Sequence, residues 1–255
     1  MFRLFALLYG AACYALSLLT ILYAIPFVTG VAVPRTVDSG RSAPLMTALL
    51  IDLALLGIFA LQHSVMARPA FKRVFTRWVP DEIERSTYVL ASSVALILLF
   101  WQWHTLPVQI WQMNDPLVRW VLYAVSACGW LLMFLSTFLI NHFELFGLRQ
   151  VWVHARGRRP LPDTPFVVRA FYRIVRHPLM LGLLIAFWAT PNMSLGHLLF
   201  ALANTGYILL AVRFLEERDL LAQFGSTYRT YQQEVPMLLP RLGRRKQRSP
   251  LRRPA

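Results

Sequence analysis

The chain has 255 residues, of which 57% are hydrophobic and only 15% are charged, and its formal net charge is +14 at pH 7. Soluble domains carry roughly 25% charged residues, so this composition excludes an ordinary soluble protein and indicates an integral membrane protein. A charge of +14 would also suit a nucleic-acid-binding protein, but the placement of the basic residues argues against that class.

Long runs with almost no charge follow one another along the chain. Four runs have about the 20 residues that one membrane-spanning helix needs; they cover residues 4–25, 45–65, 86–103 and 120–140. A fifth run, residues 178–212, is too long for one span, and turn-forming residues fill its middle at 190–196. We therefore predict an all-α polytopic membrane bundle of about six spans, the last two forming a helical hairpin.

The basic residues fall almost entirely on one side of this predicted bundle. Only Arg35, Arg41 and Arg119, of 26 Lys and Arg residues, lie in segments on the other side. The positive-inside rule then places both termini in the cytoplasm and favours an even number of spans. We expect one membrane domain over residues 1–240. A basic tail, 241–255, follows it, and we expect this tail to be disordered and attracted to anionic membrane lipid rather than to nucleic acid.

Charged residues stand at both ends of the predicted hairpin. Arg176 and His177 precede Pro178, which begins a helix whose first-turn N–H groups attract anions. Glu216 and Glu217 follow the second helix, where the helix dipole disfavours acidic residues, so a ligand cation or a nearby arginine would explain them better. In an antiparallel hairpin the two pairs converge, and together they suit a zwitterion such as an amino acid group. The alternative for the first pair is a snorkelling arginine with a chance His-Pro at the start of a span, and the alternative for the second pair is a solvated face.

Three sequence blocks occur in order in the last third of the chain. They are Arg176-His177-Pro178 with Gly182, then Glu216-Glu217, then Phe224-Gly225 with Tyr228 and Tyr231, closing on Val235-Pro236. This order resembles the isoprenylcysteine carboxyl methyltransferase and phospholipid methyltransferase superfamily, whose members are integral membrane enzymes using S-adenosylmethionine. Many members have a tyrosine where this chain has Met180. The resemblance implies a set of cofactor-binding residues, namely Arg176, His177, Pro178, Met180, Gly182, Glu216, Glu217 and Tyr228.

Upstream blocks narrow this resemblance. They are Gln62-His63-Ser64, the segment 84–88 and the segment 136–150, and they resemble the nurim-like branch and, within it, the bacterial methanethiol S-methyltransferases. The resemblance implies methyl transfer from S-adenosylmethionine to methanethiol, giving dimethyl sulfide, in the bacterial inner membrane with the active site facing the cytoplasm. Methylation of another thiol, of sulfide or of a lipid, and a non-enzymatic nurim-like membrane protein, remain alternatives.

Such a reaction needs a deprotonated acceptor, because the thiolate is the reactive form of a thiol. Three residues near the predicted cytoplasmic ends of spans are candidate bases: His142, which we rank first, Glu144 and His63. Polar and aromatic residues beside them are candidates for the substrate pocket, namely Asn141, Phe143, Glu84, Arg85 and Tyr88. Hydrogen-bonded side chains without a catalytic role are the alternative for each. The chemistry requires no metal, and we predict none.

Overall fold

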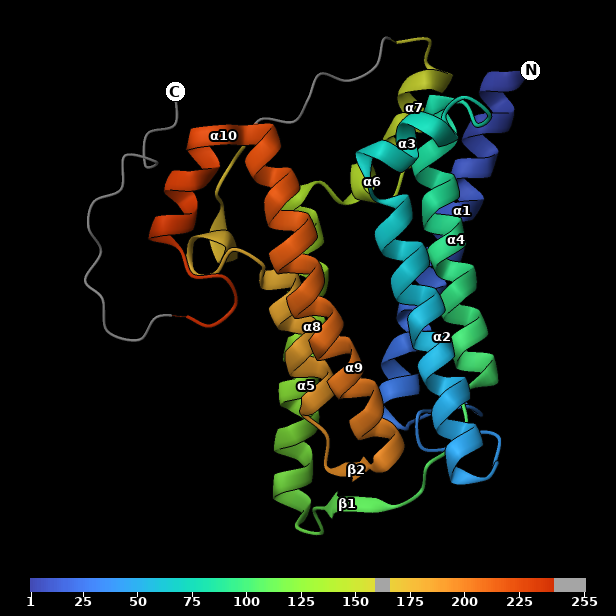
Figure 1. Ribbon diagram of the computed structural model, residues 1–255, viewed down its shortest axis with the longest axis vertical. Coiled ribbons are helices and arrows are strands. Elements are labelled where there is room, and N and C mark those ends of the chain that lie inside the picture. The colour runs from blue at the N-terminus through green and yellow to red at the C-terminus, as the bar shows by residue number, and fades with distance from the viewer. Residues whose placement is uncertain (159–165, 241–255) are drawn as a thin grey trace.

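The computed structural model describes residues 1–158 and 166–240, which form a bundle of helices running along one long axis (Figure 1). Five of its helices are long and apolar enough to cross a membrane: α1 (Phe2–Thr29), α2 (Leu45–Met66), α4 (Asp81–Gln102), α5 (Pro116–Ile140) and α9 (Leu195–Ala211) with its continuation. The prediction of an all-α polytopic membrane bundle is confirmed.

The predicted hairpin also forms, but its first arm is short. Helix α8 (Pro178–Trp188) has 11 residues, which makes it about 16 Å long, against the roughly 30 Å of a bilayer core. The turn after it contains strand β2 (Asn192–Ser194), which pairs antiparallel with β1 (Gln109–Gln112). We did not expect this small sheet, because strands of three and four residues are too short to leave a readable alternation.

Helix α4 begins at Asp81, five residues before the uncharged run that predicted it. Its first turn contains Asp81, Glu82 and Glu84, which favour a helix N-terminus through the helix dipole. A span predicted from the absence of charge necessarily starts too late at such a helix.

Short elements cap one end of the bundle. They are α3 (Pro69–Phe75), α6 (His142–Leu145), α7 (Leu148–Ala155), the 3₁₀ helix η1 (Ala170–Arg173) and α10 (Glu217–Glu234). Helix α1 starts at this same end, whereas β1 and β2 lie at the opposite end (Figure 1). The side of the membrane that each end faces remains a prediction, and the basic tail 241–255 lies outside the described residues.

The hydrophobic core is densest where α1, α4 and α9 meet. The ring of Phe27 lies 4.6 Å from that of Phe100 and 6.1 Å from that of Phe200, measured between centroids. Trp103 packs edge-on against the same group. This cluster joins the final hairpin to the first half of the chain.

Helices α5 and α8 pack unusually closely through facing glycines. A Cβ atom added to Gly182 would lie 2.6 Å from the carbonyl oxygen of Gly129, so only glycine fits there. The hydroxyl of Ser126 donates to the carbonyl of Ala186 across the same contact, at 3.1 Å. Small residues allow membrane helices to approach in this way, and here the contact fixes the helix that begins directly after His177.

Candidate functional site

The charged residues at the two ends of the hairpin lie side by side. Arg176 donates from Nη2 to Oε1 of Glu217 at 2.6 Å and from Nε at 2.7 Å. His177 Nε2 lies 3.2 Å from the same oxygen, and its Nδ1 lies 3.4 Å from Oε2 of Glu216. The predicted convergence of the two pairs is therefore confirmed, and we call Arg176, His177, Glu216 and Glu217 the charged cluster.

Three backbone features position the charged cluster. Pro178 is the first residue of α8, where its fixed φ and missing N–H are tolerated. The N–H groups of Arg176 and His177 donate to the carbonyls of Pro236 and Met237, at 2.8 and 3.1 Å. Between α9 and α10 lies a π-helical turn, η2 (Val212–Glu216), of the kind often found at functional sites.

Helix α10 bends back on itself at Gly225, and its two arms can be followed in Figure 1. Gly225 has φ 55° and ψ −126°, a conformation that glycine adopts readily and other residues rarely do. The second arm returns to the charged cluster, where Gln232 Nε2 donates to Oε2 of Glu217 at 3.2 Å. The Phe224-Gly225 block therefore has a structural reason, which is to close α10 over Glu217.

The charged cluster is mostly buried and internally paired. The side chains of Arg176 and Glu217 are only 10% and 7% exposed, whereas that of Glu216 is 43% exposed. The sequence predicted that the Arg176-His177 pair would bind the anionic group of a zwitterion. In the structure the guanidinium of Arg176 already binds Glu217. Glu216 offers the open carboxylate of the charged cluster.

His177 is the cation that Glu216 and Glu217 share. Burial by itself lowers the pKa of His177, but hydrogen bonds and charge from the two carboxylates outweigh burial and raise the pKa to about 9. His177 is therefore protonated at neutral pH, and it acts in this site as a charged donor and not as a base.

This raised pKa predicts a stability that depends on pH. Because the folded value lies above the unfolded value of about 6.5, the contribution of His177 is fully present below pH 6.5 and is lost as pH rises through about 9. We expect the melting temperature of the detergent-purified protein to fall across that window. In His177→Gln the melting temperature should be lower at pH 6.5 and should fall by less over the same pH range. An equal fall in both proteins would contradict the assignment of this pH dependence to His177.

Tyr228 carries an unused polar group next to the charged cluster. Its side chain is 1% exposed, and its hydroxyl has no hydrogen-bond partner among the described residues. Buried polar groups are usually paired, so this hydroxyl is a group that a bound ligand could pair. Tyr231 differs, because its hydroxyl donates to the carbonyl of Tyr172 at 2.6 Å. Phe166 packs against both tyrosines, 5.8 and 5.3 Å away between ring centroids.

Two further cofactor candidates lie within α8. Met180 is half-buried and brings no hydroxyl, and Gly182 contacts the backbone of α5. The packing against Gly129 by itself accounts for glycine at position 182, and cofactor contact by either residue remains a prediction.

A second polar cluster surrounds His63 on α2. The hydroxyl of Tyr88 lies 3.0 Å from both ring nitrogens of His63, and the hydroxyl of Ser92 lies 3.2 Å from Nδ1. Ser92 donates its own proton to the carbonyl of Tyr88, so it accepts from Nδ1–H, and Nε2 carries the lone pair. The guanidinium of Arg85 lies 4.8 Å over the ring of Tyr88. We call His63, Tyr88, Ser92 and Arg85 the His63 cluster.

Two contacts connect the His63 cluster to the helices that hold the charged cluster. Ser64, next to His63, lies 3.0 Å from the hydroxyl of Tyr207 on α9. Arg68 pairs with Asp219, two residues after Glu217, at 2.8 Å. The sequence did not identify Tyr207 or Arg68 as part of this region. Asp219 follows Glu217 closely and could have indicated that a basic residue pairs with it.

His142 occupies a different environment. Its Nδ1 lies 2.8 Å from the hydroxyl of Thr137, which donates to the carbonyl of Phe134, so Nδ1 carries the proton. Its Nε2 accepts from the hydroxyl of Tyr14 on α1 at 2.9 Å, and Phe138 stacks on the ring. Burial lowers the pKa of His142. The imidazole is thus neutral with both nitrogens engaged by hydroxyl groups of the protein.

The structure therefore does not gather the three candidate bases into one group. Glu144 accepts from Asn141 and pairs with Arg149 at 2.7 Å. The ring of Phe143 is half exposed beside Tyr14. Of the other substrate-pocket candidates, Arg85 and Tyr88 join the His63 cluster, whereas Glu84 is buried and faces Lys72 at 3.6 Å.

Comparison with known proteins places the chain among described relatives. The family model of the NnrU protein matches residues 50–238. The methanethiol S-methyltransferase of Mycobacterium tuberculosis is 56% identical over 93% of this chain and 97% of its own length. Methanethiol S-methyltransferase 2 of Bradyrhizobium diazoefficiens is 53% identical over 94% and 92%. Nurim of Mus musculus is 35% identical over 69% of each chain. No solved structure matches.

Proposed function

Because the chain belongs to the NnrU protein family, we propose that it is a membrane methyltransferase that converts methanethiol to dimethyl sulfide with S-adenosylmethionine as methyl donor. Relatives named methanethiol S-methyltransferase are 46–56% identical over most of the chain. The structural observation that carries the proposal is the charged cluster beside the unpartnered hydroxyl of Tyr228.

The residues present fit the proposed cofactor. Glu216 has an open carboxylate for its amino group, and the Tyr228 hydroxyl can bond one of its polar atoms. The rings of Phe166, Tyr228 and Tyr231 offer faces on which an adenine ring or a sulfonium cation is stabilised. When bound, S-adenosylmethionine supplies an electrophilic methyl group on its sulfonium. The Arg176–Glu217 pair holds the start of α8 against α10, and these two elements border the proposed cofactor site.

On the acceptor side we propose His63, rather than His142, as the base, because the Ser64–Tyr207 and Arg68–Asp219 contacts connect its helix to the helices that hold the charged cluster. The S–H proton of methanethiol passes to Nε2 of His63 in place of the hydrogen bond that Tyr88 makes there, while Ser92 keeps accepting from Nδ1–H. The thiolate so formed at His63 would accept the methyl group that bound S-adenosylmethionine would supply, leaving S-adenosylhomocysteine and dimethyl sulfide. Arg85 places a positive charge near the developing thiolate, and a dry site favours a reaction in which charges neutralise.

We further propose that the charged cluster faces the cytoplasm of a bacterial inner membrane. The charged cluster lies directly before α8 and where η2 meets α10, and α10 lies toward the end of the bundle where α1 starts (Figure 1). Apart from Arg35, Arg41 and Arg119, the Lys and Arg residues in the described part of the chain lie in segments toward this end. A water-soluble cofactor would enter from there, whereas methanethiol, small and apolar, can arrive through the lipid.

The direct test is headspace analysis of membranes that contain the expressed chain. With methanethiol and S-adenosylmethionine labelled in its methyl group, we expect labelled dimethyl sulfide, and with sulfide in place of methanethiol we expect much less methylated product. A folded sample that binds the cofactor but forms no dimethyl sulfide would exclude this activity, and one that binds no cofactor would favour a non-enzymatic role.

Substitution of the two histidines separates the acceptor-side alternatives. His63→Gln should lower kcat by about 100-fold, the usual lower range for loss of a general base, and leave the Kd for S-adenosylmethionine within about threefold. Raising the pH should restore part of the rate of His63→Gln, because methanethiol then ionises without help. His142→Gln, the matched control, should retain most of the rate; the opposite ranking would show that His142 is the base.

A further inference from the structure

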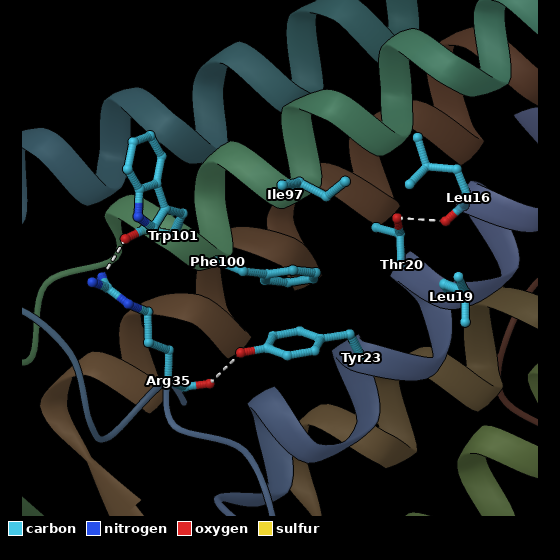
Figure 2. Close-up of a pocket in the computed structure, with 8 residues that line it drawn as sticks. All are labelled: Leu16, Leu19, Thr20, Tyr23, Arg35, Ile97, Phe100 and Trp101. Carbon is cyan, nitrogen blue, oxygen red and sulfur yellow. Dashed lines mark hydrogen bonds between the residues drawn. The ribbon is translucent and has the colours of Figure 1, made fainter.

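A pocket of about 360 Å³ opens between α1 and α4, at the end of the bundle away from the charged cluster (Figure 2). Its walls are mainly apolar, with Leu19 from α1 and Ile97 and Phe100 from α4. Leu19 is 64% and Ile97 40% exposed. Because both helices have the length and hydropathy of membrane spans, this groove opens toward lipid. Its shape and chemistry suit an alkyl chain.

Two guanidinium groups flank the mouth of the groove. Arg35 lines it and donates from Nη1 to the carbonyl of Trp101, and its own carbonyl accepts from Tyr23 at 3.2 Å (Figure 2). The guanidinium of Arg41 lies 5.7 Å from the centre of the Trp101 ring. The backbone and Trp101 therefore hold both arginines at the rim.

Neither arginine is neutralised by a carboxylate. Among residues 1–158 and 166–240, no ion pair involves Arg35 or Arg41. Asp38, the one acidic residue between them, accepts from the hydroxyl of Ser194. Within 1–158 and 166–240, the one further Lys or Arg residue on this side of the bundle is Arg119, and basic residues are generally rare on one side of a membrane protein. Two uncompensated cations above an apolar groove favour an amphipathic anion at this site.

We propose that the groove between α1 and α4 holds one acyl chain of an anionic phospholipid whose phosphate lies between Arg35 and Arg41. Guanidinium groups bind phosphate oxygens with paired, charge-assisted hydrogen bonds. Trp101 and Tyr23 lie toward the C-terminal ends of α4 and α1, and aromatic residues near the ends of membrane helices commonly meet headgroups. The bound lipid joins α1, α4 and the loop between α1 and α2. This site is distinct from the charged cluster and independent of the proposed methyl transfer.

Native mass spectrometry of the full chain, purified in detergent, tests the proposal. With phosphatidylglycerol we expect one tightly retained lipid per protein, and with phosphatidylcholine much weaker retention. The double variant Arg35→Gln/Arg41→Gln should bind phosphatidylglycerol about tenfold or more weakly, since each nearby basic residue contributes about fivefold. Arg119→Gln, which removes the third arginine of this side, is the matched control and should bind as the parent does.

A second pair of variants tests the groove itself. Ile97→Trp fills it and should displace the lipid, whereas Leu50→Trp, at an exposed site on α2 that does not line the pocket, should not. Glycerol phosphate, which has the charge but no chain, should fail to compete. Equal retention of the two lipids, full competition by glycerol phosphate, or unchanged binding in the double variant or in Ile97→Trp would overturn the proposal.

Discussion

Glu217→Gln is expected to reduce kcat/KM for dimethyl sulfide formation by 100-fold or more. Glu217 accepts from Arg176, His177 and Gln232, and its side chain is 7% exposed. Removing its charge leaves the guanidinium of Arg176 buried without its counter-ion. Breaking a buried ion pair from one side costs about 3–5 kcal/mol, and here that cost falls on the start of α8, which carries the proposed cofactor site.

The measurement is steady-state kinetics together with the Kd for S-adenosylmethionine from calorimetry. Glu82→Gln is the matched control: Glu82 pairs with His154 at 3.2 Å but is about one-third exposed, on the first turn of α4, and its loss should change kcat/KM less than about threefold. If Glu217→Gln bound the cofactor with the affinity of the parent protein, the charged cluster would not be the cofactor site.

Gly182→Leu is expected to prevent recovery of folded protein, and Gly182→Ala to lower its melting temperature. The first added carbon at position 182 meets the carbonyl oxygen of Gly129 at 2.6 Å and the backbone nitrogen of Met133 at 2.7 Å. Neither atom belongs to a flexible side chain, so α5 and α8 must separate. Overpacking of this kind costs about 1–3 kcal/mol for a small group, which corresponds to about 3–10 °C.

Cofactor affinity should fall together with stability in Gly182→Ala, because α8 positions Arg176 and His177. Gly206→Ala provides the control, since a Cβ added in the middle of α9 meets nothing within 4 Å and alanine favours a helix. Thermal unfolding of both variants, with calorimetric titration of the cofactor, checks this. A Gly182→Ala protein as stable as Gly206→Ala would mean that α8 can shift freely on α5.

The properties that depend on local sequence were predictable from the chain alone. Runs without charge located the five long helices, because a bilayer excludes charged residues over a fixed length. The turn residues between Pro178 and Val212 predicted the hairpin, and an antiparallel hairpin must bring Arg176 close to Glu217. The ends of the helices were predicted less accurately. Helix α4 begins at Asp81, and its charged first turn cannot be recognised from hydropathy.

Only the tertiary structure decided which polar groups are paired and which remain available. Tyr14 and His142 are 128 residues apart in sequence, and their hydrogen bond depends on the packing of α1 against the chain after α5. The same kind of packing brings the ring of His63 to the hydroxyl of Tyr88, and it leaves the hydroxyl of Tyr228 without a partner among the described residues. Hydropathy and motif spacing act along the chain, whereas hydrogen-bond partners are chosen by the contacts between helices. For this reason the sequence alone determined the membrane bundle and the position of the charged cluster, and the tertiary structure determined the hydrogen-bond partners of His63 and His142.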